Sequence, residues 1–175
     1  MEWTPIFQSQ ASPYTQGDNW QLLFDDTIVE DQTAGWEQYI RRTVASFRCS
    51  LCKRTWPSNR VTVLFHFYLD NNTHQGTVKV RRYRQNCKRC TNAPMEQPRV
   101  RDENVAILME NLVKNIRKKC YHETFDEVPR EYMGVEVDSP HEPAHCEGCI
   151  AGVCLRDPTM PNAARGSGSG RRGHR

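Results

Sequence analysis

Three C-x-x-C pairs constrain this chain more than any other feature of its sequence. Hydrophobic residues make up 37% of the 175 residues, and the mean hydropathy is −0.77. Such a composition is lean for a chain that folds by apolar burial alone. We therefore expect the cysteines to contribute to the folding free energy. The eight cysteines are, in order, Cys49, Cys52, Cys87, Cys90, Cys120, Cys146, Cys149 and Cys154.

The sequence carries no targeting or membrane-spanning pattern. The N-terminal residues lack the basic stretch and apolar core of a secretory signal peptide. The longest apolar stretch, residues 61–69, is interrupted by Thr62 and His66, and it falls well short of the ~18 apolar residues of a spanning helix. We expect a protein of the reducing cytoplasm, where paired cysteines are metal ligands more often than disulfides.

The cysteine spacing predicts two closed zinc sites. A C-x-x-C turn presents two thiolates to one ion, and structural zinc takes four nitrogen or sulfur ligands in a tetrahedron. The three pairs supply six ligands, and residues 141–154 add the rest. The partition that keeps the ligand groups contiguous gives a first site of Cys49, Cys52, Cys87 and Cys90. It gives a second site of His141, Cys146, Cys149 and Cys154.

Two alternatives stay open on spacing alone. In an interleaved arrangement, Cys49/Cys52 would share an ion with Cys146/Cys149. His145 could replace His141, although it adjoins Cys146, and ligands from consecutive residues would strain the chelate.

The remaining candidate groups favour a protein that is not an enzyme. Cys120 falls on the apolar stripe of a predicted helix and is expected in the core. His66, inside an apolar strand, is expected to be a core histidine. No Ser/His/Asp or paired-carboxylate arrangement stands out, and eight ligands favour closed sites over a catalytic zinc with an open position.

The hydrophobic periodicity predicts an α+β fold, small and zinc-stabilised. Trp36, Tyr39, Ile40 and Val44 follow helical spacing and predict an N-terminal helix within residues 20–44. A three-stranded antiparallel sheet is expected from residues 47–52 with Trp56, residues 61–69 and residues 77–84. A long amphipathic helix follows, N-capped by Asp102 and reaching residue 120. A terminal zinc knuckle completes the domain. We expect a flexible lead-in over residues 1–19, the domain over 20–155 and a disordered Gly/Ser/Arg-rich tail over 156–175.

The charge is concentrated in the middle of the chain. Residues 1–40 contain seven acids and no Lys or Arg, whereas residues 41–101 contain fourteen Lys and Arg against two acids. Interleaved aromatic residues make this block suitable for single-stranded RNA or an acidic partner, and a solvated sheet face is the plain alternative. The candidate contact residues are Arg48, Lys53, Arg54, Lys79, Arg81, Arg82, Arg84, Lys88 and Arg89.

Several motifs, in order and at matching spacing, resemble the receptor-transporting protein family, whose members carry a 3CxxC-type zinc finger domain. The similarity covers roughly residues 20–155. Its main stretches are WEQYIRRTVASFRCSLCKRTWPSNRVTVLFHFY, QGTVKVRRYRQNCKRC, NLVKNIRKKCY and PHEPAHCEGCIAGVC.

This resemblance implies a zinc-binding accessory protein that brings G-protein-coupled receptors of odorant or taste type to the cell surface. One branch of the family is interferon-induced and antiviral, so binding of viral RNA is the alternative function. Family members commonly end in a hydrophobic anchor, whereas this sequence ends in RGSGSGRRGHR. We therefore expect at most peripheral association with the endoplasmic reticulum or plasma membrane.

Overall fold

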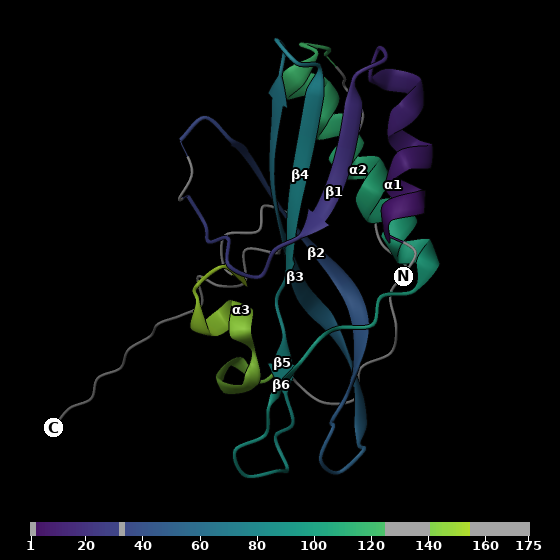
Figure 1. Cartoon of the computed structure of the whole chain (residues 1–175). Helices are drawn as coiled ribbons and strands as arrows, with labels where there is room; N and C mark the ends of the chain where they lie inside the picture. Colours follow the sequence, from purple (N-terminus) through teal and green to yellow (C-terminus); the bar gives the residue numbers. More distant parts are fainter. Residues whose placement is uncertain (1–2, 32–33, 125–140, 155–175) are drawn as a thin grey trace, which may run out of the picture.

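The structure is a computed structural model of the whole chain, and it describes residues 3–31, 34–124 and 141–154. Two longer helices, a four-stranded sheet and a small second sheet form the body of the molecule (Figure 1). The helices are α1 (Trp3–Ala11), η1 (Ser12–Tyr14), α2 (Asp102–Cys120), η2 (Pro143–His145) and α3 (Glu147–Ile150). The strands are β1 (Asn19–Phe24), β2 (Glu37–Arg48), β3 (Thr55–Asp70), β4 (Gln75–Arg82), β5 (Gln85–Asn86) and β6 (Met95–Glu96).

The main sheet has the strand order β1-β4-β3-β2. Strands β2, β3 and β4 form an antiparallel meander, and β1 adds to β4 in parallel, with Trp20 opposite Gly76. Gly76 is required at this position because a Cβ there would lie 2.1 Å from the Trp20 indole. The predicted three-stranded sheet is therefore wrong by one strand, since the parallel pairing of β1 and β4 joins segments more than fifty residues apart.

The two faces of the sheet are covered differently. On one face, α1 and α2 close the main core, in which Val63, Phe65 and Phe67 of β3 are fully buried (Figure 1). On the other face, Ile40 and Leu64 pack against Tyr83 and Val153. The segment 141–154 with α3 lies on this second face, which places its cysteines against the sheet.

The N-terminal helix exists, but at a different place from the predicted one. Residues 37–48 form strand β2, with a bulge between Thr43 and Ala45. The expected flexible lead-in contains α1 instead, which buries Trp3, Phe7 and Ala11 at helical spacing. The long amphipathic helix is present as α2, but its N-cap is Arg101 and Asp102 is its first residue.

Candidate metal centres

The first cluster lies at one end of the long strands. Cys49 and Cys52 come from the loop between β2 and β3, and Cys87 and Cys90 come directly after β5. The four sulfur atoms lie within 4.8 Å of one another, with Cys49–Cys90 and Cys52–Cys87 Sγ–Sγ distances of 3.8 Å. A tetrahedron with Zn–S bonds of about 2.3 Å has S–S edges of about 3.8 Å. All four cysteines are free thiols, so the donor set fits one zinc ion.

Backbone hydrogen bonds shape the Cys49 loop around its sulfur. The Cys49 N–H donates to the Arg54 carbonyl at 2.8 Å, and the Lys53 N–H donates to the Cys49 carbonyl at 3.0 Å. Lys53 closes the loop in the left-handed region, at φ 67°. The Leu51 N–H then points at the Cys49 Sγ, 3.4 Å away. The backbone hydrogen bond from Cys52, together with that from Leu51, lowers the Cys49 pKa, which favours the thiolate that binds metal.

A charged side chain supports the Cys87 thiolate. Burial by itself raises the pKa of Cys87, but the Arg54 Nε–H donates to its Sγ at 3.4 Å and the Arg89 N–H does the same at 3.4 Å. These hydrogen bonds bring the pKa of Cys87 down to about 6. Arg54 therefore acts on the cluster as well as being a basic surface residue.

The second cluster lies against the outer face of the sheet. His141, Cys146, Cys149 and Cys154 bring their ligand atoms within 4.8 Å of one another. The Cys146 and Cys154 sulfurs are 3.7 Å apart, and the His141 Nε2 is 3.3 Å from the Cys149 Sγ. The hydrogen bond with Cys154, followed by that with His141, lowers the Cys146 pKa to about 4. Three thiols and one imidazole at these distances also fit one zinc ion.

The sheet is shaped to accept this cluster. The Cys154 Sγ lies 3.2 Å from the Thr62 hydroxyl of β3, and both side chains are buried. A Cβ at Gly148 would lie 2.7 Å from the same sulfur. Gly148 thus allows α3 to approach Cys154 closely, and the cluster becomes part of the sheet's packing.

One carboxylate fixes the second cluster to the end of β4 and the residues that follow it. Glu147 stands between Cys146 and Cys149 and accepts hydrogen bonds from the Arg84 N–H at 2.9 Å, Nε–H at 3.2 Å and Nη2–H at 2.7 Å. Arg81 Nη2 adds a fourth at 3.2 Å. Although burial raises the pKa of Glu147, the Arg84 contacts bring it below its usual value. The chain pattern alone did not indicate this role, because Glu147 and its partners are more than sixty residues apart.

The two clusters contain the same residues as the two zinc sites predicted from contiguous ligand groups. The structure does not form the interleaved arrangement of Cys49/Cys52 with Cys146/Cys149. His145 lies outside the second cluster, and its Nδ1 is 2.8 Å from the Asn86 Oδ1. Asn86 donates its amide Nδ2–H to the Ala93 carbonyl, which leaves its Oδ1 as an acceptor beside the His145 ring.

Of the two other residues with core predictions, His66 is buried as expected, whereas Cys120 is only partly buried at the edge of the core. His66 is 3% exposed, with its Nε2 2.9 Å from the Gln38 Oε1, and burial lowers its pKa. Cys120 is partly buried against the main core, and burial raises its pKa to about 11.

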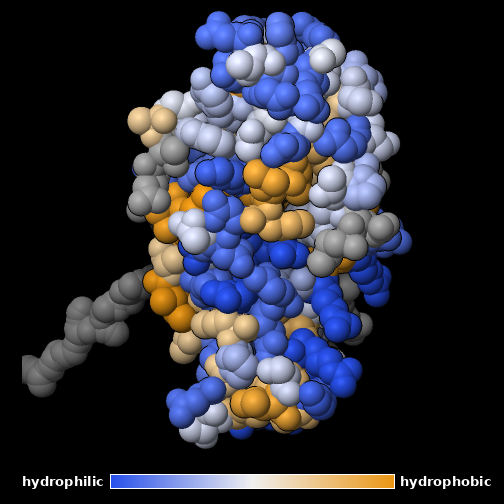
Figure 2. Space-filling model, in the orientation of Figure 1, coloured by the Kyte–Doolittle hydropathy of each residue, from blue (hydrophilic) through white to orange (hydrophobic). Residues whose placement is uncertain are grey.

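The predicted basic residues do not form one continuous face. Arg81 and Arg84 bind Glu147, and the Arg82 guanidinium lies over the Phe24 ring at 4.1 Å. Lys79 lies over Trp36 at 4.9 Å. The other candidates surround the first cluster, where Arg48, Lys53, Lys88 and Arg89 are exposed and Arg54 is half-buried. Figure 2 shows strongly hydrophilic surface between α3 and the lower end of the long strands.

The fold and the two clusters define a two-zinc domain, in which one cluster lies at one end of the long strands and the other lies against the outer face of the sheet. Comparison with known proteins agrees, because a zinc-binding domain of the 3CxxC zinc-ribbon type matches residues 42–152. In the part of the chain that the structure describes, no helix combines the length and hydropathy needed to cross a membrane. No solved structure gives a significant match.

The similar proteins share one name. Mouse receptor-transporting protein 2 is 31% identical over 155 residues, which cover 87% of this chain and 69% of that protein. Human receptor-transporting protein 4 is 34% identical over 87% of this chain and 63% of its own length. Mouse receptor-transporting protein 3 is 31% identical over 89% of this chain and 34% of its own length. The chain belongs to the receptor-transporting protein family, and it spans between about a third and two thirds of the length of these relatives.

Proposed function

We propose that this chain is a non-enzymatic accessory protein that promotes trafficking of G-protein-coupled receptors, of odorant or taste type, to the cell surface. The observation that carries the proposal is the match to receptor-transporting proteins along 87% of the chain, together with the zinc-binding domain that matches residues 42–152 and includes seven of the eight clustered residues. In this role the chain works by binding: it holds a receptor segment on the cytoplasmic side of the membrane until export.

We further propose that the eight clustered residues are the zinc ligands. Zinc supplies structural cross-links here, since each ion would join segments that are distant in sequence. The first cluster joins the β2–β3 loop to the chain after β5, and the second fixes residues 141–154 to the sheet. The free energy of metal binding at such a site contributes directly to the stability of the fold, on the order of 10 kcal/mol per site.

Co-expression with a panel of odorant and taste receptors tests the proposed function. Surface receptor, counted by antibody on unpermeabilised cells, should rise with the wild-type chain. Cys87→Ala should abolish the rise because it opens the first cluster. Cys120→Ala is the matched control, since it also removes a cysteine but lies outside both clusters. Unchanged surface signal across the panel with the wild-type chain would refute the trafficking role.

A further inference from the structure

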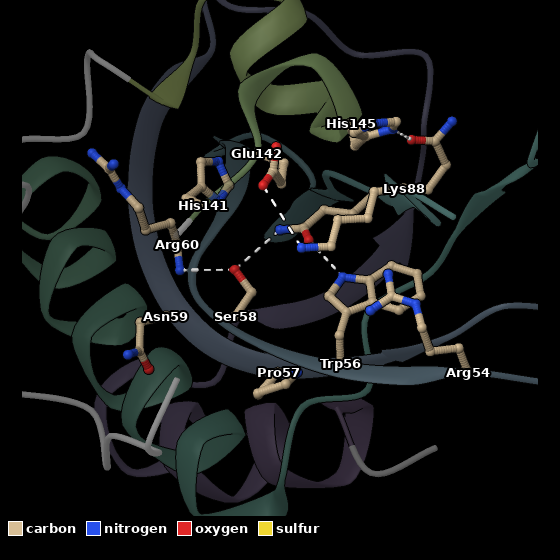
Figure 3. Close-up of a pocket in the computed structure, with 12 residues that line it drawn as sticks. Arg54, Trp56, Pro57, Ser58, Asn59, Arg60, Lys88, His141, Glu142 and His145 are labelled. Carbon is tan, nitrogen blue, oxygen red and sulfur yellow. Dashed lines mark hydrogen bonds and ion pairs between the residues drawn. The ribbon is translucent and has the colours of Figure 1, made fainter. Parts of the chain in front are cut away.

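A pocket of about 270 Å³ lies between the two metal clusters. Arg54, Trp56 and Arg60 form one wall from β3 and the residue before it, and Lys88, Glu142 and His145 form the other (Figure 3). The side chains of Trp56, Ser58 and Arg60 share one face of β3, because they alternate along the strand. The pocket is therefore built by the same segments that the two clusters hold in place.

The pocket floor is a fixed network of neutral polar groups. Trp56 Nε1–H donates to the Gln85 Oε1 at 2.9 Å, and the Gln85 Nε2–H donates to the Ser58 hydroxyl at 3.0 Å. The Arg60 N–H also donates to that hydroxyl at 3.2 Å. Gln85 and Ser58 are buried, so these groups hold their positions before any ligand arrives.

The rim of the pocket has an excess of positive charge. Arg54, Arg60 and Lys88 line the pocket together with one carboxylate, that of Glu142, and the Arg54 guanidinium is already bound to the Cys87 sulfur. Lys88 and Glu142 form a loose pair at 3.8 Å, with side chains 33% and 43% exposed. Such an open pair contributes little stability. An incoming carboxylate can therefore replace Glu142 at Lys88 at low cost.

The aromatic residue of the pocket is already stacked. The Trp56 ring lies parallel to Phe47 at 5.4 Å, and the Arg54 guanidinium lies over it at 4.6 Å. Recognition of single-stranded RNA relies on open aromatic faces along a continuous basic track. Here Arg81 of β4 and Arg84, just after it, would extend such a track, but both bind Glu147. These contacts favour small carboxylates over nucleobases.

We propose that this pocket binds the carboxylate side chains of an acidic peptide segment in a partner protein. Arg60 and Lys88 pair with the carboxylates, and the fixed floor limits how deeply the segment enters. This site goes beyond the trafficking role, because it concerns what kind of segment is bound, whichever protein carries it.

Fluorescence anisotropy with the zinc-loaded full chain tests the proposal. The probes are a fluorescein-labelled EELEE peptide, the neutral QQLQQ peptide and a labelled pentauridylate RNA. The pocket variant is Arg60→Gln/Lys88→Gln. The matched control is Lys118→Gln/Lys119→Gln, which removes the same charge from an exposed end of α2. Zinc content of two per chain and an unchanged unfolding midpoint verify that each variant is folded.

Binding of EELEE should exceed that of QQLQQ and should weaken at about 0.3 M salt, because exposed charge pairs are screened. The pocket variant should lose about tenfold in affinity for EELEE, while the control should keep it. Equal affinity for both variants, or equal binding of both peptides, would overturn the proposal. Tighter binding of the pentauridylate with the same dependence on Arg60 and Lys88 would reassign the pocket to RNA.

Discussion

Replacing Glu147 by Gln should weaken the attachment of the second cluster to Arg81 and Arg84, at the end of β4 and just after it. The carboxylate accepts four hydrogen bonds from Arg84 and Arg81, and the Glu147 side chain is 15% exposed. Hydrogen bonds to charged groups contribute about 1.5–3 kcal/mol each in favourable cases, and breaking a buried pair costs about 3–5 kcal/mol. Because Arg84 is 34% exposed and Gln retains one acceptor oxygen, we expect a loss of about 2–3 kcal/mol.

The same change should lower zinc affinity at the second cluster, since Glu147 orients the turn that carries Cys146 and Cys149. A loss of about 1.4 kcal/mol corresponds to a factor of ten in affinity. If the whole loss of about 2–3 kcal/mol fell on metal binding, zinc affinity would drop by at most about a hundredfold. Urea unfolding followed by circular dichroism measures the first effect, and competition with a chromogenic chelator measures the second.

Glu142→Gln is the matched control, because it makes the same substitution on the same segment at an open ion pair. It should cost less than about 1 kcal/mol. An unfolding free energy of Glu147→Gln within about 0.5 kcal/mol of wild type would refute the reasoning, since surface substitutions fall in that range.

Three further outcomes follow from the structure. Cys154→Ala should lower bound zinc from two ions per chain to one, counted by native mass spectrometry. Gly76→Ala should lower the free energy of unfolding by about 3 kcal/mol in urea titrations, because the new Cβ would overlap the buried Trp20 ring. Burial lowers the pKa of His66 from its usual 6.5, because the folded state disfavours the charged imidazole. The contribution of His66 to the free energy of unfolding is therefore complete above pH 6.5 and is lost as the pH falls below it. His66→Gln should therefore flatten the pH dependence of unfolding just below pH 6.5, and an unchanged slope would contradict this.

The metal groups could be predicted from the sequence, because ligand chemistry depends on residue type and short spacing. The contiguous partition needs only that each knuckle be a local turn. Strand β2 could not be predicted in the same way. Both of its faces are covered, and the bulge between Thr43 and Ala45 shifts the alternation, so Ile40 and Val44 imitate a helical period.

The N-terminal elements were missed for different physical reasons. Trp3, Phe7 and Ala11 have helical spacing, and Pro5 is tolerated because it lies in the first turn. Strand β1 has no local hairpin partner and is stabilised by β4, which no pattern within its own six residues indicates. The hydrogen bonds from Arg81 and Arg84 to Glu147 likewise depend on a tertiary contact, which no local sequence pattern indicates.

The parallel pairing of β1 with β4 has a consequence for synthesis on the ribosome. The first twenty-four residues emerge with Trp3, Phe7, Trp20 and Leu22 uncovered, and these side chains are buried only once β4 and α2 are available. At about 5–20 residues per second, the hundred residues up to the end of α2 take about 5–20 s to appear. During this time the apolar side chains of α1 and β1 stay uncovered and are available to chaperones.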